Sequence, residues 1–310
     1  MEKVKFIMLC GLPASGKSTY CEQYKHDKDW AVLSSDEIRA ELCGDVNDQS
    51  KNELVFKLLH QRVKDDLRAG KNVIYDATNL NRKRRIAFLH EIKNISCEKI
   101  CVLFATPWEQ CLANNFTRDR QVPEEAMTRM YSNYDAVWYS EGWDDIQIVW
   151  WKYETRGDFG YNINLDIERW KEISHNSPYH SLSIGEHMEE AYKYMSNQTN
   201  DDRLLAAALL HDCGKPDVKA YINSKGEQTE IAHYYNHESC GAYKSLFYLK
   251  DKYPKWSDSI LYVSLLINLH MRYHLAYKQS EKAKEKDRKL FGDKVMSDLE
   301  TLYLADLAAH

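Results

Sequence analysis

The sequence predicts an α/β domain with a parallel sheet, followed by an all-α domain. Three observations lead to this prediction. A buried strand at residues 4–10 runs directly into the glycine-rich segment GLPASGKST. Strands then alternate with amphipathic helices to about residue 150, and nine of the twelve histidines lie from His175 onward, where apolar residues recur at helical spacing. We therefore expect a first domain at residues 1–153, a linker at 154–177 and a second domain at 178–310.

Length and composition exclude several classes of protein. At 310 residues the chain is long enough for two domains. A formal net charge of -5 argues against a general nucleic-acid coat protein, so contact with nucleic acid requires a local patch. The eight cysteines form no CxxC pair, which favours a reducing, cytoplasmic setting over a disulfide scaffold. No apolar stretch approaches the roughly 20 residues that span a bilayer, so we expect no membrane partner.

The segment after the first strand matches the P-loop of nucleoside triphosphatases. It has the pattern GxxxxGK[ST], in the strand, loop and helix order that this pattern requires. Backbone N–H groups of such a loop wrap nucleotide phosphates, the lysine bridges the outer phosphates and the serine holds Mg²⁺. We therefore expect ATP, or another nucleoside triphosphate, together with Mg²⁺. The residues expected to bind them are Gly11, Ala14, Ser15, Gly16, Lys17, Ser18 and Thr19.

Two acidic residues lie at the ends of later strands in this half. One strand ends near Ser34, just before Asp36, another ends at Asp76, and a third ends near Ala105. Because ligands of an open parallel sheet lie at the carboxyl ends of its strands, Asp36, Asp76 and the P-loop are expected to share one crevice. One carboxylate could take the proton of an attacking hydroxyl while the other helps to place Mg²⁺. Helix capping is the alternative role for each.

Four further segments carry a family resemblance: LSSDEIR, DATNLNRKRR, FATPWEQ and NNFTRDRQVPEEAMTRMY. They resemble the kinase domain of the polynucleotide 5′-kinase family over about residues 4–150. That family phosphorylates 5′-hydroxyl ends of RNA or DNA with ATP. The resemblance implies that Asp36 is the general base and that Arg39 grips the phosphate of the acceptor. It also implies that Arg118 and Arg120 belong to a lid that clamps the phosphates of the donor.

Two clusters in this half leave alternatives open. The basic run at residues 82–85 could hold the acceptor strand, or it could be a solvated helix face. The aromatic cluster between Tyr131 and Trp143 could stack bases, or it could pack in the core or at a domain interface.

Ionisable side chains recur on apolar helix faces in the second half. Ser183 and Glu186 form a capping box that opens a helix, with His187 in its first turn. His211 and Asp212 end the apolar helix LLAAALL. Buried imidazoles and carboxylates require partners, and a metal ion is one candidate, while direct His–Asp hydrogen bonds are the other. Comparable apolar segments carry His237, His270 and Asp306.

The order H, HD, H, H, D resembles the HD phosphohydrolase superfamily over roughly residues 178–310. The segments YHSLSIGEH, LLHDCGKP and NHESCGA are similar to HD modules attached to RNA-processing enzymes. The resemblance implies that Asp212 bridges two divalent metal ions and that Lys215 faces the substrate phosphate. It assigns the first metal to His187, His211, Asp212 and Asp306, and the second to Asp212, His237 and His270.

The identity of the metal and two of its ligands stay open at this point. Imidazoles mixed with carboxylates suit Mn²⁺, Fe²⁺, Co²⁺, Ni²⁺ or Zn²⁺ better than Mg²⁺. His233 is an alternative to His237, and His274 to His270, because each pair is four residues apart. The segment YINSKGEQTEIAHYY predicts a short hairpin, which is either a flap over the site or a plain surface hairpin.

Both halves together resemble the bifunctional end-healing enzymes of RNA repair. Such an enzyme phosphorylates 5′-hydroxyl ends and removes 2′,3′-cyclic phosphate or 3′-phosphate, with RNA or DNA ends as substrates and a ligase as partner. One alternative is a kinase of a nucleoside or small metabolite joined to an HD nucleotidase. Another is an RNA-binding regulator whose HD module senses a nucleotide.

Overall fold

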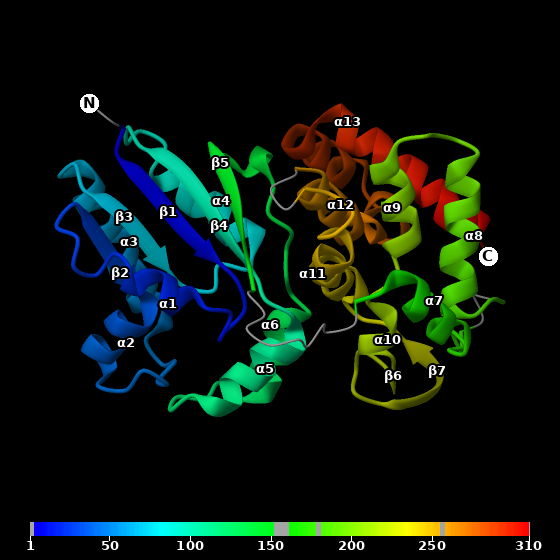
Figure 1. Cartoon of the computed structure of the whole chain (residues 1–310), viewed down its shortest axis with the longest axis horizontal. Helices are drawn as coiled ribbons and strands as arrows, with labels where there is room; N and C mark the ends of the chain where they lie inside the picture. Colours follow the sequence, from blue (N-terminus) through cyan, green and yellow to red (C-terminus); the bar gives the residue numbers. More distant parts are fainter. Residues whose placement is uncertain (1–2, 152–160, 178–180, 255–257, 310) are drawn as a thin grey trace. The chain divides into compact units, whose positions relative to one another are not determined.

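A computed structural model describes residues 3–151, 161–177, 181–254 and 258–309 (Figure 1). The chain packs as two units, which are described separately. The first comprises Met1–Met127 and Val137–Lys152, and the second comprises Thr128–Ala136 and Tyr153–His310. No helix among the described residues is both long enough and apolar enough to span a membrane.

The first unit is built on a five-stranded parallel sheet, which confirms the predicted fold class. The strand order is β2-β3-β1-β4-β5, so the strand that leads into the P-loop lies at the centre. The first four strands end where the sequence places their ends, whereas the edge strand β5 was not predicted. The strands are β1 (Lys5–Cys10), β2 (Trp30–Ser34), β3 (Asn72–Asp76), β4 (Glu98–Ala105) and β5 (Asp145–Trp150).

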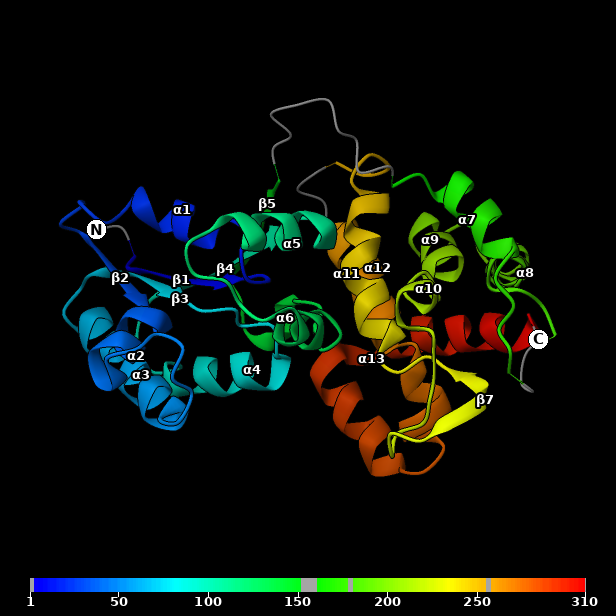
Figure 2. The same ribbon diagram turned by 90° about the horizontal axis from the view of Figure 1, so that it is seen from below.

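Helices cover both faces of this sheet. Figure 2 shows α1 and α5 on one face and α2, α3 and α4 on the other. Both faces of β1 are apolar and buried, with Ile7 and Leu9 on one face and Phe6 and Met8 on the other. The helices are α1 (Lys17–Glu22), α2 (Ser35–Cys43), α3 (Asn52–Arg68), α4 (Arg82–Glu91) and α5 (Trp108–Thr117). Helix α6 (Glu124–Tyr131) begins in the first unit.

The basic run at residues 82–85 is divided between the interior and the surface, because Arg82 and Arg85 are buried whereas Lys83 and Arg84 are exposed. Arg85 is fully buried, and its Nε and Nη2 each donate to a carboxylate oxygen of Glu141 at 2.7 Å. Its Nη1 donates to the carbonyl oxygens of Asn79 and Leu80 at 3.0 Å. Arg82 is also buried, 3.7 Å from the same carboxylate. These arginines therefore fix the loop after β3 from inside the domain.

The second unit is mostly helical, as predicted, with one antiparallel hairpin where the sequence predicts it. Its helices are α7 (Ile163–Lys171), α8 (Ile184–Ser196), α9 (Asp202–Leu210), α10 (Lys215–Val218), α11 (His237–Leu249), α12 (Asp258–Leu269) and α13 (Glu281–Ala308). The hairpin pairs β6 (Ala220–Ile222) with β7 (Gln228–His233), and a π-helical turn, η2, spans Tyr273–Tyr277. A short 3-10 turn, η1 (Tyr139–Glu141), lies in the first unit.

Two segments before the predicted start of the second domain belong to the second unit. Tyr131 and Tyr134 pack edge-to-face on Tyr243 of α11, with ring centroids 5.7 and 5.1 Å apart. The Asn268 side chain accepts a hydrogen bond from Ala136 N and donates one to the carbonyl oxygen of Tyr134. These two tyrosines of the aromatic cluster thus serve packing. Helix α7, which Asn162 caps, occupies much of the expected linker, and the boundary at residue 153 itself stays a prediction.

We expect Glu141→Gln to lower the thermal unfolding midpoint strongly. Arg85 would keep its charge without its buried carboxylate, and breaking a buried pair from one side costs about 3–5 kcal/mol. Thermal unfolding followed by circular dichroism would measure the effect. Glu41→Gln removes the exposed partner of Arg62 and should leave the midpoint unchanged. Equal midpoints for the two variants would contradict the structural role of the buried pair.

Candidate phosphate-transfer and metal sites

The P-loop joins β1 to α1 and has the backbone that a phosphate cradle needs. Gly16 has a φ of 100° and Ala14 a φ of 59°, both in the left-handed region that glycine tolerates best. A Cβ atom at Gly11 would lie 2.8 Å from Ser15 Oγ and 2.9 Å from Phe104 Cβ, so only glycine fits there. The loop therefore bends tightly in front of the first turn of α1, where Ser18 and Thr19 are exposed.

Lys17 is held inside this loop. Its Nζ donates to the carbonyl oxygens of Gly11 at 2.9 Å and Leu12 at 2.6 Å. Burial lowers the pKa of Lys17, and the nearby carboxylate of Asp76 opposes that shift. A buried ammonium that bonds only neutral oxygens retains its capacity to pair with an anion. The lysine is thus positioned for phosphate.

Asp36 and Asp76 lie at neighbouring strand ends, as predicted. Ser34 at the end of β2 pairs in register with Asp76 at the end of β3, and its hydroxyl caps α2 by accepting from Asp36 N. Burial raises the pKa of Asp76, while Lys17 opposes this shift and Asp36 adds to it. Asp76 therefore interacts with both Lys17 and Asp36, and the three residues lie at or just after the carboxyl ends of the adjacent strands β1, β2 and β3.

Two guanidinium groups bind the carboxylate of Asp36. Oδ1 accepts from Arg39 Nη1 at 2.8 Å, and Oδ2 accepts from Arg120 Nη1. Arg120 also donates to the side chain of Asn47 and the carbonyl of Val46, in the segment after α2. The structure therefore brings Arg120 to the carboxylate expected to serve as base, a contact that sequence reasoning did not anticipate.

Arg39 and Arg118 each have a buried Nε–H group that makes no hydrogen bond. Arg39 Nη2 donates to Asn52 Oδ1 at 2.9 Å, but its Nε makes no hydrogen bond. The Nε of Arg118 is likewise buried without a hydrogen bond. Burial and the adjacent charge of Arg120 lower the pKa of Arg118. Such donors favour a phosphate ligand, because an anion would satisfy them.

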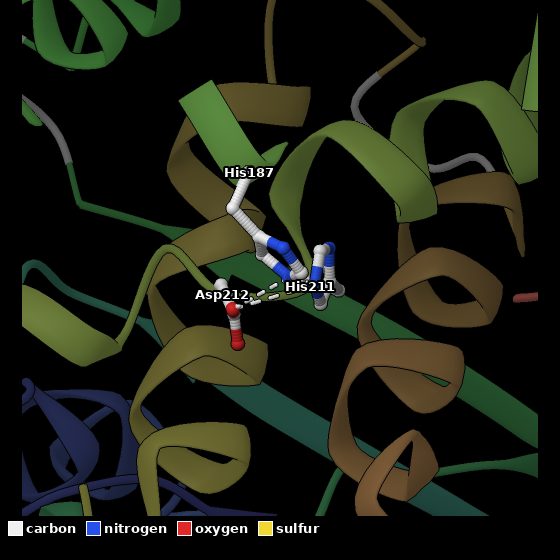
Figure 3. A group of neighbouring side chains, drawn as sticks. All are labelled: His187, His211 and Asp212. Carbon is white, nitrogen blue, oxygen red and sulfur yellow. Dashed lines mark hydrogen bonds and ion pairs between the residues drawn. The ribbon is translucent and has the colours of Figure 1, made fainter. Parts of the chain in front are cut away.

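The second site gathers ionisable side chains from five helices. His187 lies in the first turn of α8, and His211 and Asp212 follow the end of α9 (Figure 3). His237 opens α11, and the other two ligand candidates, His270 and Asp306, lie just after α12 and in the last turn of α13. All six side chains are buried. The end of α9 at Leu210 is what turns the adjacent His211 and Asp212 into the interior.

Asp212 is shared by two groups of candidate metal ligands. Its Oδ2 lies 3.3 Å from His187 Nε2 and 3.4 Å from His211 Nε2, and the Nε2 atoms of these histidines are 3.1 Å apart. Asp306 Oδ1 joins this group, 3.1 Å from His187 Nε2. Metal–nitrogen bonds of about 2.0–2.1 Å place neighbouring ligand atoms about 3–3.5 Å apart, so the spacing fits one ion.

The second group lies on the other oxygen of the same carboxylate. Asp212 Oδ1 is 3.2 Å from His237 Nε2 and 3.8 Å from His270 Nε2, and these two nitrogens are 3.2 Å apart. One oxygen of the Asp212 carboxylate therefore faces each group, and the bridging role of Asp212 stays a prediction.

The hydrogen bonds of the four histidines require a cation between them. Each Nδ1 lies 2.7–3.1 Å from a backbone carbonyl oxygen, which can only accept, so each Nδ1 carries the ring proton. The Nε2 lone pairs then face one another across 3.1 and 3.2 Å. Two lone pairs at this distance repel unless a proton or metal ion lies between them. The residues present therefore fit divalent transition metals.

The charges of the site agree with this conclusion. Burial opposes ionisation of Asp212, but Lys215 and His211 outweigh it and hold its pKa well below the usual range. Burial likewise disfavours the imidazolium of His211, yet Asp212 and Asp306 raise its pKa to about 9. The carboxylates thus favour one added positive charge at His211, and either a proton or a metal ion can supply it.

Two alternative ligands from the sequence lie apart from both groups. His274, in the π-helical turn η2, bonds Asp306 Oδ2 at 2.7 Å through Nε2. His233 stacks on Tyr235 with an interplanar angle of 5°. His274 therefore orients a ligand, and His233 belongs to the hairpin.

Lys215 contacts the bridging carboxylate, and a histidine that sequence reasoning missed supports it. Lys215 Nζ lies 2.6 Å from Asp212 Oδ2 and 3.2 Å from His175 Nε2. His175 is fully buried, and its Nδ1 bonds the carbonyl oxygen of Leu182. No motif of the sequence includes His175, because its position depends on a long-range contact with α10. His180, close to it in sequence, lies outside the described residues.

Comparison with protein families identifies both halves. Residues 6–137 match the family model described as an AAA domain, and residues 179–306 match the model described as an HD domain. The chain joins a kinase-type P-loop domain to an HD domain. These matches support an enzyme that uses a nucleotide with Mg²⁺ in the first half and divalent metal in the second.

Individual relatives cover only parts of the chain. An L-seryl-tRNA(Sec) kinase from Methanococcus maripaludis is 26% identical over 167 residues, 52% of this chain and 63% of that protein. The transcription factor bHLH140 of Arabidopsis thaliana is 30% identical over 112 residues, 36% of this chain and 11% of that protein. The chain thus spans less than two thirds of either relative. In the Pnkp1/Rnl/Hen1 RNA repair complex, one chain is similar with a TM-score of 0.39 and 22% identity, over 43% of this chain and 44% of that chain.

We expect the purified protein to carry at least one transition metal ion in the HD domain. Asp212→Ala removes the carboxylate shared by both ligand groups, so it should weaken Mn²⁺ binding by more than about 100-fold. Elemental analysis and titration calorimetry of the full chain would measure this. His233→Ala is the matched control and should bind as wild type. Wild-type protein that stays metal-free after addition of Mn²⁺ would contradict the metal assignment.

Proposed function

We propose that this protein is a bifunctional enzyme that heals nucleic-acid ends, those of RNA in particular. The P-loop domain would transfer the γ-phosphate of ATP to a 5′-hydroxyl end. The HD domain would hydrolyse a 2′,3′-cyclic phosphate or 3′-phosphate. A ligase that joins the healed ends is the class of partner that this activity implies. We propose domain limits of 1–153 and 178–310 for the two activities.

The pair of arginines on Asp36 carries the kinase half of the proposal. A free nucleoside is a neutral acceptor, so it has no anionic group that the two guanidinium groups beside Asp36 could bind. A polynucleotide end presents a phosphate next to its terminal nucleoside, and Arg39 and Arg120 would bind it. This favours a nucleotide end as the acceptor.

The chemistry of transfer follows from these positions. The 5′-oxygen forms a bond to the γ-phosphorus, the bond from that phosphorus to ADP breaks, and Asp36 takes the hydroxyl proton. Lys17 would neutralise charge on the phosphates, and the buried Nε of Arg118 would donate a hydrogen bond to them. Mg²⁺, when bound near Ser18 and Asp76, supplies further charge neutralisation. Positioning and charge account for most of the catalysis in such transfers.

The HD half relies on the shared carboxylate and on Lys215. Metal ions held there would lower the pKa of a water molecule and make hydroxide available near neutral pH. Lys215, fixed between Asp212 and His175, is placed to bind the substrate phosphate. The oxygen of water bonds to phosphorus, the bond to a ribose oxygen breaks, and that oxygen takes a proton.

An alternative is a kinase with a different hydroxyl acceptor. The relative from Methanococcus maripaludis bears the name of a kinase of seryl-tRNA, and it is 26% identical to this chain. A nucleoside or metabolite kinase joined to an HD nucleotidase, or a regulator whose HD module senses a nucleotide, are further alternatives. Acceptor competition among an RNA with a 5′-hydroxyl, seryl-tRNA and free nucleosides separates these possibilities.

We expect Asp36→Ala and Lys17→Ala each to reduce phosphorylation of a 5′-hydroxyl oligonucleotide by at least about 100-fold. The first removes the base and the second removes a charge from the phosphate cradle. Transfer from radiolabelled ATP measures the rate. Lys57→Ala, an exposed change on α3, is the control. A near wild-type rate for Asp36→Ala would refute its assignment as base, and faster phosphorylation of free nucleosides would favour the small-molecule alternative.

The two activities should be separable by single substitutions. Asp212→Ala should abolish hydrolysis and leave kinase activity within about twofold, because its contacts lie within the second unit. The assay uses RNA with a 5′-hydroxyl and a 2′,3′-cyclic phosphate, incubated with ATP, Mg²⁺ and Mn²⁺, with both ends analysed. Loss of both activities in Asp212→Ala would show that the domains depend on one another.

A further inference from the structure

The hairpin β6–β7 exposes apolar side chains beside the HD site. Four of the eleven exposed large apolar side chains of the described residues lie between residues 221 and 235: Tyr221, Ile222, Ile231 and Tyr235. A cluster of this kind on a hairpin of nine strand residues marks a binding surface, because isolated exposed apolar residues are the norm elsewhere.

One end of the hairpin is tied directly to the catalytic groups. Lys215 Nζ lies 5.5 Å from the centroid of the Tyr234 ring and 2.6 Å from Asp212 Oδ2. The Tyr234 hydroxyl donates to the carbonyl oxygen of His175 at 2.7 Å, which fixes the ring. The carbonyl oxygen of Tyr234 in turn accepts from Nδ1 of His237, a candidate metal ligand. Tyr234 is therefore a rigid aromatic wall at the edge of the phosphate position.

Tyr221 extends this wall outward. Both tyrosines lie next to the backbone of residues 174–176. The Tyr234 hydroxyl donates to the carbonyl oxygen of His175, and Lys219 Nζ, which lies over the Tyr221 ring, donates to the carbonyl oxygen of Ser174 at 2.6 Å. Ala220 pairs with His233 across the hairpin, so the backbone of Tyr221 and the backbone of Tyr234 each adjoin that pair. The Tyr221 ring is 41% exposed, and Lys219 Nζ lies 5.8 Å from its centroid. An exposed ring beside a lysine is suited to stack a base of a nucleotide.

We propose that Tyr221 and Tyr234 form a nucleobase subsite of the HD domain, which stacks the terminal base of the substrate. This rests on the proposed phosphohydrolase function and specifies its substrate as a nucleotide end. The phosphate is held at Lys215, which lies over the Tyr234 ring. The sugar lies along Tyr234, and the more exposed Tyr221 stacks the base. Stacking tolerates any base, so the subsite selects nucleotides over other phosphoesters without selecting sequence.

The test compares two cyclic phosphates in the full chain, with Mn²⁺ and without ATP. Adenosine 2′,3′-cyclic phosphate has a base and glycerol 1,2-cyclic phosphate has none. Tyr221→Ala should lower kcat/KM about tenfold for the first and leave the second unchanged, because one stacked base is lost. Ile222→Ala, which removes an equally exposed apolar side chain from the same strand but no aromatic ring, is the control and should change neither. Tyr221→Phe should retain the wild-type rate.

A binding measurement separates this inference from the proposed function. Calorimetric titration with adenosine 3′-monophosphate should show weaker binding in Tyr221→Ala than in Ile222→Ala. The first units of the two variants are identical, so any binding of the nucleotide to the P-loop domain is the same in both. If wild type hydrolyses neither substrate but this difference persists, the subsite stands and the hydrolase function falls. Equal loss on both substrates, or equal binding in the two variants, would overturn the subsite and leave the hairpin as a docking surface for protein. Unfolding midpoints of all variants confirm that they are folded.

Discussion

The carboxylate of Asp212 is the constraint on which the second unit depends. Its two oxygens face different pairs of histidines, and Lys215 contacts it as well. A buried carboxylate is tolerated only when it is compensated, so α8, α9, α11 and α12 must each deliver a positive or neutral partner to the same point. The helix ends rather than the helix centres supply these residues. This requirement sets where α9 stops and where α11 begins.

In the first unit, the ends of strands rather than the ends of helices bring the charged residues of the site together. The order β2-β3-β1 places the ends of three parallel strands side by side, and with them Asp36, Asp76 and the P-loop. Backbone geometry fixes the loop through Gly11 and Gly16. The HD site, by contrast, is fixed by side-chain hydrogen bonds from each Nδ1 to a carbonyl oxygen. Backbone conformation thus orients the site of the first unit, whereas hydrogen bonds that fix the tautomers of the histidines orient the site of the second.

Motifs whose geometry is local could be predicted from the sequence, and contacts that depend on the whole fold could not. The GxxxxGK[ST] pattern and the strand ends at Ser34 and Asp76 are properties of short segments. The buried role of Arg85 depends on Glu141, which lies 56 residues away. A basic run does not reveal which of its members turns inward, because helix spacing alone does not say which face the sheet will cover. His175 escaped prediction for the same reason.

The contact between Arg120 and Asp36 illustrates the limit of assigning roles by position in a motif. The resemblance assigns Arg120 to the donor phosphates, whereas its guanidinium pairs here with the carboxylate beside the acceptor position. A side chain as long as arginine reaches either place from the same backbone, and the nearest anion decides between them. Here the anion that Arg120 pairs with is Asp36.

The two sites share one electrostatic feature, which is a cation beside a carboxylate. Lys17 lies near Asp76, Arg39 pairs with Asp36, and Lys215 pairs with Asp212. In each case a carboxylate compensates the cation, which offsets the free energy of burying an isolated charge. In the proposed function, each cation would bind a phosphate, and the same carboxylate would remain beside it to take a proton or hold a metal ion. The residues that compensate charge in the folded protein would thus also position the reacting groups.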